Sequence, residues 1–235
     1  MSNPYFQFKQ FTVWHDRCAM KVGTDGALLG AWADVSGASR ILDVGTGTGL
    51  VALMLAQRRP EALLTAVEID SAAAAQAAEN VSRSPWPDRI RVVCADFASF
   101  ESDDRFDLVV SNPPYFVESL SCPDPRRACA RHAASLTYAT LLTRAASLLA
   151  PGGRLALVLP ADVWPQVESI ARCCRLYARC LVRVQTTWKA VPKRVLVSLE
   201  REEGACASSV LTIECAPRVY SPAFTALLKD FYLRL

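Results

Sequence analysis

Short apolar runs alternate with alanine- and leucine-rich segments along most of this chain from Arg40 onward. The pattern predicts strands at 40–44, 63–69, 89–95, 106–111 and 153–160, and helices at 49–58, 71–83, 138–150 and 163–174. Strands that stay apolar at successive positions are buried on both faces, as in a parallel sheet covered by helices. With right-handed crossovers, this alternation predicts an α/β fold with a doubly wound, Rossmann-like sheet that is mostly parallel.

The two ends of the chain depart from this alternation. No convincing helix separates the apolar runs at 180–187 and 193–201, so we expect antiparallel strands at one edge of the sheet. A further edge strand is expected at 209–215 and a closing helix at 221–235. Before Arg40, an extended segment leads into a short helix. Since no repeat or linker interrupts the chain, we expect a single domain over 1–235, with its core at 40–235 and an N-terminal extension at 1–39.

Composition narrows the class of protein. The chain has 235 residues, of which 51% are hydrophobic and 21% charged, and this is enough to bury a full core. No apolar stretch approaches membrane-spanning length, and the N-terminus lacks the apolar region of a signal peptide. Nine scattered cysteines, two histidines and no C-x-x-C predict reduced thiols in a cytoplasmic protein, with no metal site and no membrane partner. The net charge of +3 is too small to identify a partner.

A glycine-rich loop follows the first core strand in "LDVGTGTGL". Asp43 ends the strand, and Gly45, Gly47 and Gly49 permit positive φ angles and close approach of a ligand to the backbone. A phosphate-binding P-loop needs Lys and Ser/Thr after its last glycine, and a dinucleotide-binding loop needs a third glycine where Leu50 stands. The spacing D-x-G-x-G-x-G is instead typical of S-adenosylmethionine (SAM) enzymes. A tight turn without a ligand is the alternative.

Acidic residues end the next two strands. Glu68 follows the second core strand, where a carboxylate can accept hydrogen bonds from ribose hydroxyls. Asp96 follows the third, where it could reach an adenine amino group, with Phe97 available to pack on the ring. Each acid alone could equally be a helix cap or a solvated loop residue. Their order at successive strand ends favours a SAM site.

The fourth core strand ends in Asn112-Pro113-Pro114-Tyr115. An amine conjugated to an aromatic ring or a carbonyl is a weak nucleophile, and acceptors for both of its N–H groups favour a lone pair aimed at a methyl donor. The Asn112 side-chain oxygen and the Pro113 carbonyl are two such acceptors, and each following proline restricts the residue before it. Tyr115 could stack on a planar group. This scheme requires no general base, and its alternative is a rigid turn without chemistry.

Taken together, these motifs resemble a known family. "DVGTGTG" with "NPPYF" resembles the class I amino-methyltransferases that modify nitrogen in adenine, guanine or glutamine. The stretches "FTVWHDRCAMKVGTDGALLGAW", "ARH", "PKRVLVSL" and "LLKDFYLRL" narrow the resemblance to the bacterial tRNA adenine-N6 methyltransferase family that acts on valine tRNA. It covers essentially the whole chain. It implies SAM as the cofactor, adenine 37 of the tRNA as the target, and the anticodon stem-loop as the partner.

The resemblance also implies roles for particular residues. In the N-terminal extension, a cover over the cofactor would be formed by Lys21, Gly23, Thr24 and Asp25. Residues that would hold SAM are Asp43, Gly45, Gly47, Glu68, Asp96, Phe97 and Asn112. The target base would be held by Asn112, Pro113 and Tyr115.

RNA contacts are expected in the loop after "NPPYF". Phosphates beside the target base would be reached by Arg126, Arg127, Arg131 and His132. A second basic stretch runs from Arg172 to Arg194, and no Asp or Glu occurs from Ser169 to Leu199. Whether that stretch is a solvated face or an RNA contact stays open.

Other functions share the same motifs. Glutamine-N5 methylation of a protein such as a release factor uses similar "NPPY" chemistry, although those enzymes usually carry a separate helical N-terminal domain. Guanine-N2 methylation of ribosomal RNA is a further alternative. An RNA-binding module without activity would need neither the glycine loop nor "NPPY".

Overall fold

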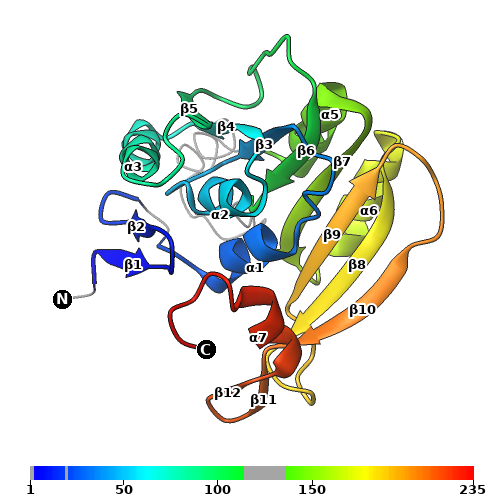
Figure 1. Cartoon of the computed structure of the whole chain (residues 1–235). Helices are drawn as coiled ribbons and strands as arrows, with labels where there is room; N and C mark the ends of the chain where they lie inside the picture. Colours follow the sequence, from blue (N-terminus) through cyan, green and yellow to red (C-terminus); the bar gives the residue numbers. More distant parts are fainter. Residues whose placement is uncertain (1–2, 19–20, 114–135) are drawn as a thin grey trace, which may run out of the picture.

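Figure 1 shows the computed structural model of the chain, which describes residues 3–18, 21–113 and 136–235. In these residues the central sheet has eight strands in the order β10-β8-β9-β7-β6-β3-β4-β5. The strands are β3 (Arg40–Val44), β4 (Leu63–Glu68), β5 (Ile90–Cys94), β6 (Phe106–Ser111), β7 (Leu149–Pro160), β8 (Tyr177–Gln185), β9 (Arg194–Glu200) and β10 (Ala207–Thr212). Adjacent strands from β5 to β7 are parallel. The fold is therefore the expected Rossmann-like α/β sheet.

Helices cover both faces of this sheet. One face carries α1 (Thr24–Trp32), α2 (Leu50–Arg58), α3 (Ser71–Ser82) and α7 (Pro222–Leu228), and the other carries α5 (Tyr138–Leu148) and α6 (Trp164–Cys173) (Figure 1). A hairpin of β1 (Tyr5–Gln7) and β2 (Thr12–Trp14) precedes α1, and β11 (Glu214–Ala216) pairs with β12 (Val219–Tyr220) before α7.

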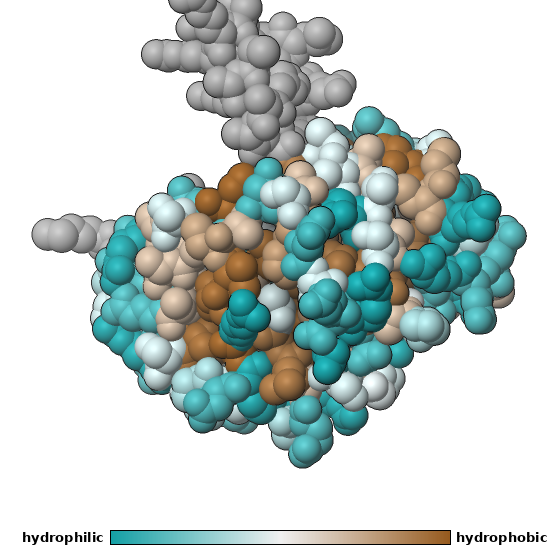
Figure 2. Space-filling model, turned by 90° about the horizontal axis from the view of Figure 1, so that it is seen from above, coloured by the Kyte–Doolittle hydropathy of each residue, from teal (hydrophilic) through white to brown (hydrophobic). Residues whose placement is uncertain are grey.

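Alternating side chains of the core strands enter two separate apolar clusters. On β3, Ile41 packs with α1 and α2, whereas its neighbour Leu42 packs with α5 on the opposite face. On β6, Leu108 and Val109 divide in the same way. This explains why these strands are apolar at successive positions. Seen from above, polar residues surround an apolar area near the middle of the view, and a smaller apolar group lies near one edge (Figure 2).

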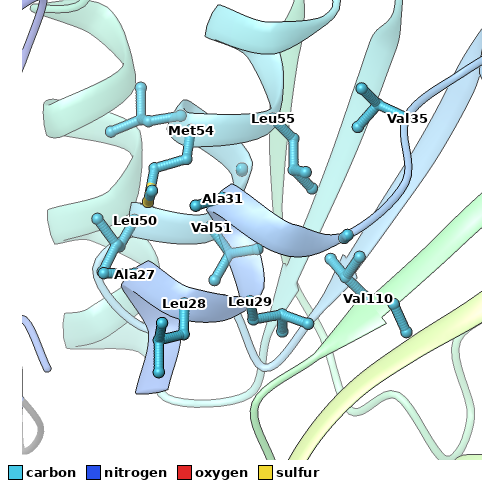
Figure 3. Packing of buried hydrophobic residues seen from close by; sticks show 14 of the residues in the cluster. Ala27, Leu28, Leu29, Ala31, Val35, Leu50, Val51, Met54, Leu55 and Val110 are labelled. Carbon is cyan, nitrogen blue, oxygen red and sulfur yellow. The ribbon is translucent and has the colours of Figure 1, made fainter. Parts of the chain in front are cut away.

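Helices α1 and α2 pack against each other, and Ala27 and Ala31 of α1 lie beside Leu50 and Met54 of α2 (Figure 3). A Cβ atom added at Gly30 would lie 2.8 Å from the Met54 sulfur and 2.9 Å from its Cβ. At Gly26, one turn earlier, an added Cβ would lie 3.2 Å from Leu50. Glycine at these positions therefore brings the start of α1 close to the glycine-loop end of α2.

The structure corrects several expected boundaries. The helix expected at 138–150 ends at Leu148, and β7 begins at Leu149. The closing helix expected at 221–235 extends only over Pro222–Leu228. After the helix, residues 229–231 form a turn, and Tyr232 forms an isolated β-bridge with Phe8.

The edge of the sheet has the expected antiparallel pairing, except that the outermost strand, β10, is parallel to its neighbour. Strand β9 lies between β7 and β8 and is antiparallel to both. Strand β8 therefore has the same direction as the core strands, and β10 is parallel to β8. Because β7 and β8 point the same way, the loop after β8 lies at the same rim as the carboxyl ends of β3, β4 and β6.

The two ends of the described chain meet beside α1. The Lys9 backbone N–H donates to the Phe231 carbonyl at 2.8 Å, and Phe8 forms a bridge with Tyr232. Phe8 and Phe231 are both buried in the cluster that contains α1 and α2. Within the described residues, no helix is both long and apolar enough to cross a bilayer.

Candidate active site at the carboxyl rim

The glycine loop connects β3 to α2 in a conformation that only its glycines adopt easily. Gly45, Gly47 and Gly49 have φ angles of 70°, 55° and 83°. The N–H groups of Gly45 and Thr46 donate to the Val67 carbonyl at 2.9 and 3.1 Å, which ties the loop to β4. A Cβ atom added at Gly45 or Gly47 would meet nothing within 4 Å. The loop therefore presents bare backbone to open space.

Asp43 holds this loop from beneath. Its carboxylate accepts hydrogen bonds from the Thr46 hydroxyl at 2.6 Å and from the Ala52 N–H at 3.2 Å, and its side chain is buried. Burial raises the pKa of the Asp43 carboxyl to about 7, the two hydrogen bonds lower it, and the nearby charge of Glu68 adds a smaller increase. Asp43 also borders the cavity above the loop, so a cationic ligand there would favour its ionised form.

Glu68 is the last residue of β4, and both of its carboxylate oxygens accept hydrogen bonds from backbone N–H groups. One carboxylate oxygen accepts from the Gly47 N–H at 2.8 Å and the other accepts from the Asp70 N–H at 3.0 Å. Each oxygen keeps a second lone pair. The predicted position of Glu68 at the strand end is confirmed, whereas its contact with ribose hydroxyls stays a prediction, since Glu68 is not among the residues that line the cavity.

Asp96 and Phe97 lie next to each other in the loop after β5, but their surroundings differ. The exposed Asp96 accepts from the Ala98 N–H at 2.9 Å, as in a helix cap. Phe97 is only 4% exposed and packs with Phe100, their ring centroids 6.3 Å apart, in the cluster beneath α5. Its side chain thus belongs to the core, and Phe97 is absent from the residues that line the cavity. Glu68 and Asp96 are absent from that lining as well, so the contacts of Asp96 and Phe97 with an adenine ring stay predictions.

The N-terminal extension forms the wall opposite the glycine loop. Lys21, Gly23, Thr24 and Asp25, the four residues expected to cover the cofactor, all line the same cavity. Asp25 accepts a hydrogen bond from Nε of Arg194 at 2.8 Å, which joins the start of α1 to the start of β9. This ion pair fixes the wall to the sheet.

Asn112 completes the cavity from the end of β6. The Ser111 hydroxyl donates to the Val44 carbonyl at 2.8 Å and thereby aligns the ends of β6 and β3. Asn112 is half-buried and Pro113 is buried, and both line the cavity. A Cβ atom added at Gly26 would lie 3.9 Å from the Asn112 side-chain nitrogen, so α1 is close to the candidate catalytic side chain.

These elements enclose a cavity of about 340 Å³. That volume lies within the usual range for a small-molecule site, about 300–1,000 Å³. Its walls combine bare glycine backbone with a buried carboxylate and with apolar side chains of α2. A cationic nucleoside-containing ligand fits this chemistry, because the backbone permits close approach and Asp43 supplies negative charge.

Two buried polar residues of α3 have contacts that the sequence pattern does not predict. Asn80 is wholly buried, accepts from the Trp14 N–H at 2.9 Å, and donates to the Trp14 and Thr48 carbonyls at 2.8 and 2.9 Å. It therefore joins β2 to the glycine loop. One turn earlier, Gln76 accepts from the Arg17 N–H at 3.2 Å. Their spacing of four residues in an alanine-rich helix was the available signal.

Several predicted site residues lie outside the described part of the chain. They are Pro114, Tyr115, Arg126, Arg127, Arg131 and His132. The proposed base-stacking and phosphate-contacting roles of these residues stay predictions from the sequence.

Comparison with known proteins gives a consistent result. Residues 21–166 match the Methyltransferase small domain family. A tRNA1(Val) (adenine(37)-N6)-methyltransferase of Bacteroides thetaiotaomicron is 56% identical over 100% of both chains. A protein of the same description from Tolumonas auensis is 46% identical over 100% of this chain and 99% of its own. A solved structure of a predicted O-methyltransferase from Agrobacterium tumefaciens has a TM-score of 0.71 over 88% of this chain and 96% of its own, and at 20% identity it shows the fold alone.

Proposed function

Because the chain belongs to the tRNA1(Val) (adenine(37)-N6)-methyltransferase family, we propose that it methylates N6 of adenine 37 in tRNA1(Val), with SAM as the methyl donor. The observation that supports this most directly is the cavity shared by the glycine loop, the 21–25 wall and Asn112. A methyl donor and a planar amine could both be held at this rim.

We assign the cofactor to the glycine-loop side of the cavity. Gly45 and Gly47 present the backbone, Asp43 contributes negative charge, and Glu68 has lone pairs left for ribose hydroxyls. When bound, SAM supplies an electrophilic methyl group on a sulfonium. Lys21 and Asp25 would close the site from the N-terminal side and exclude water.

Asn112 and Pro113 are assigned to the adenine. The exocyclic nitrogen of adenine is a weak nucleophile because its lone pair is delocalised into the ring. We propose that the Asn112 side-chain oxygen and the Pro113 carbonyl accept its two N–H bonds and hold the nitrogen in position. Acceptors fixed before the substrate arrives lower the barrier without reorganisation at the moment of reaction.

The tRNA would approach by its anticodon stem-loop, because adenine 37 lies just 3′ of the anticodon. The base must leave its stack to enter a cavity of this kind. Tyr115 is proposed to stack on the base, and Arg126, Arg127, Arg131 and His132 are proposed to contact the flanking phosphates.

The test is methylation of tRNA from a strain that lacks this gene. Purified protein, isotopically labelled SAM and total tRNA should yield N6-methyladenosine by nucleoside mass spectrometry, at position 37 of tRNA1(Val). Incorporation of label only into protein would instead favour glutamine-N5 methylation. Label in guanosine of ribosomal RNA would favour the guanine-N2 alternative.

A further inference from the structure

The loop between β8 and β9, residues 186–193, carries an exposed aromatic side chain beside positive charge. Trp188 is 68% exposed, and Nζ of Lys189 lies 4.6 Å from the centroid of its ring. Lys193 is also exposed, at the other end of the loop. We name residues 186–193 the Trp188 loop. Its residues are distinct from those that line the cavity at the glycine loop.

The Trp188 loop lies at the same rim as Asn112. In register across the sheet, Ser111 pairs with Leu157, Leu157 with Val197, and Val197 with Leu181. Strand β8 continues past Leu181 to Gln185, so the loop begins beyond the level at which β6 ends. Three inter-strand spacings separate β6 from β8, about 14 Å. The four residues from Leu181 to Gln185 add about 13 Å along the strand, so the start of the loop lies about 19 Å from the end of β6, the length of roughly six stacked bases at about 3.4 Å each.

Hydrogen bonds to β8 and to the residue after β7, and an ion pair beside the loop to Asp25, hold the end of the Trp188 loop in place. The Ala161 N–H, just after β7, donates to the Lys193 carbonyl at 3.1 Å, and the Lys193 N–H donates to the Val184 carbonyl at 3.0 Å. The next residue, Arg194, is ion-paired to Asp25 in the cavity wall. The loop is therefore fixed relative to the cavity, while its tip remains exposed.

Charge around the loop favours an anionic partner. No Asp or Glu occurs from Ser169 to Leu199, and this stretch includes the whole of β8 and most of β9. Three acids lie near the loop's ends: Asp25, which is ion-paired to Arg194, Glu214, whose backbone N–H donates to the Thr186 carbonyl at 2.8 Å, and Asp162, which follows the Ala161 that is hydrogen-bonded to Lys193. A single exposed apolar residue is ordinary. An indole with an ammonium group against it, in an acid-free stretch at the catalytic rim, has the chemistry of a single-stranded nucleic-acid contact.

We propose that Trp188 stacks on an unpaired base of the RNA substrate in the same loop as the methylated adenine, with Lys189 and Lys193 contacting the adjacent phosphates. This inference rests on the proposed tRNA substrate. It commits to a base of the anticodon loop, because a duplex exposes no base face for an indole to cover.

The experiment measures binding of a fluorescein-labelled anticodon stem-loop RNA to the full chain by anisotropy, at several salt concentrations. Trp188→Ala should weaken binding by about 5- to 100-fold, the range for loss of one base–aromatic stack, and Trp188→Phe should restore most of it. Lys189→Ala/Lys193→Ala should reduce the slope of log affinity against log salt by about 0.7 for each phosphate that no longer has a lysine beside it. SAM affinity, measured by calorimetry, should not change in any variant.

A matched control removes the same charge elsewhere. Arg91 and Arg105 are exposed, the first on edge strand β5 and the second at the amino end of β6, away from the catalytic rim. Arg91→Ala/Arg105→Ala should leave both the affinity and the salt slope unchanged. Equal effects in the two double variants would overturn the proposal, because they would show a response to net charge alone.

Two further outcomes overturn the inference without touching the proposed function. One is Trp188→Ala binding RNA within twofold of wild type while the wild type methylates adenine 37. The other is a change in sedimentation of Trp188→Ala at unchanged RNA affinity, which would make the loop a contact between copies of the chain. A wild type that forms no N6-methyladenosine contradicts the proposed function, whatever the variants bind.

Discussion

Asn112 lies where three separate parts of the chain meet. The end of β6 carries it, the Ser111–Val44 hydrogen bond aligns it with the glycine loop, and Gly26 leaves space for it beside α1. A side chain positioned by so many neighbours is suited to hold a substrate atom still. It is poorly suited to act as an acid or base, because a side-chain amide does not ionise near neutral pH.

We expect Asn112→Ala to reduce methyl transfer by about 10²–10³, the usual loss for one preorganised group that acts in the transition state. SAM affinity should change little, because the glycine loop and Glu68 are intact. Single-turnover kinetics would give the first quantity and calorimetry the second. Near-normal turnover in this variant would exclude the proposed role of Asn112.

The raised pKa of Asp43 predicts how the stability of the fold depends on pH. Burial raises the pKa of its carboxyl from 3.8 to about 7, so between these values the folded protein holds a proton that the unfolded chain releases. This single group therefore makes the fold less stable as pH rises through that window, by about 1.4 kcal/mol per pH unit. Above about pH 7 the carboxyl is ionised in both the folded and the unfolded state, so its contribution to stability no longer changes with pH. Asp43→Asn should remove this contribution, because its side chain does not ionise.

Denaturant unfolding of both proteins from pH 4.5 to 8 tests this directly. The difference in the free energy of unfolding between variant and wild type should change across that range and level off above pH 7. Curves that stay parallel would show that Asp43 is ionised throughout, and the raised pKa would then be wrong.

Helix α3 holds the N-terminal hairpin to the glycine loop through Asn80. Asn80→Ala would leave the N–H and carbonyl of Trp14 and the carbonyl of Thr48 without their partner. Each buried polar group left unsatisfied costs about 1–3 kcal/mol, so we expect a loss of several kcal/mol in unfolding free energy, reduced by any water that enters. Faster amide exchange in β2 and weaker SAM binding should accompany it.

Gln76→Ala is the matched control on the same helix face. Gln76 is as deeply buried as Asn80, but within the described residues its side chain accepts one hydrogen bond, from the Arg17 N–H. Its removal should cost clearly less than that of Asn80. Equal losses would mean that cavity formation, rather than hydrogen bonding to β2 and the glycine loop, dominates at both positions.

Elements with a strong local pattern could be predicted from the sequence, and contacts between distant elements could not. The apolar strands and the glycine spacing are local signals, so β3, β4 and β6 and the carboxyl-rim site were expected. Residues 229–235 continue an apolar pattern typical of a helix, but there the chain turns to meet Phe8 and Lys9. The burial of Phe97 and the contacts of Asn80 could not be predicted for the same reason. Phe97 is buried by Phe100 and α5, and Asn80 is hydrogen-bonded to Trp14.

The contact between the two chain ends is expected to stabilise the wall of the cavity that residues 21–25 form. Phe231 is 3% exposed and packs in the cluster that contains Phe8 and α1. Phe231→Ala should cost about 3–5 kcal/mol of unfolding free energy, the usual range for a buried phenylalanine. Amide exchange should also become faster in the β1–β2 hairpin. Leu233→Ala, at a position that is 54% exposed, is the control and should have little effect.

The same contact has a consequence for the order in which the protein matures. Nζ of Lys9 donates to the Lys229 carbonyl, and these residues are 220 positions apart. At about 5–20 residues per second, a ribosome needs roughly 10–45 s to translate that interval. During this time the nascent hairpin lacks the residues that brace it. A truncated or stalled chain would therefore carry a complete glycine loop and an unfinished opposite wall, and methyl-donor binding would begin only near the end of synthesis.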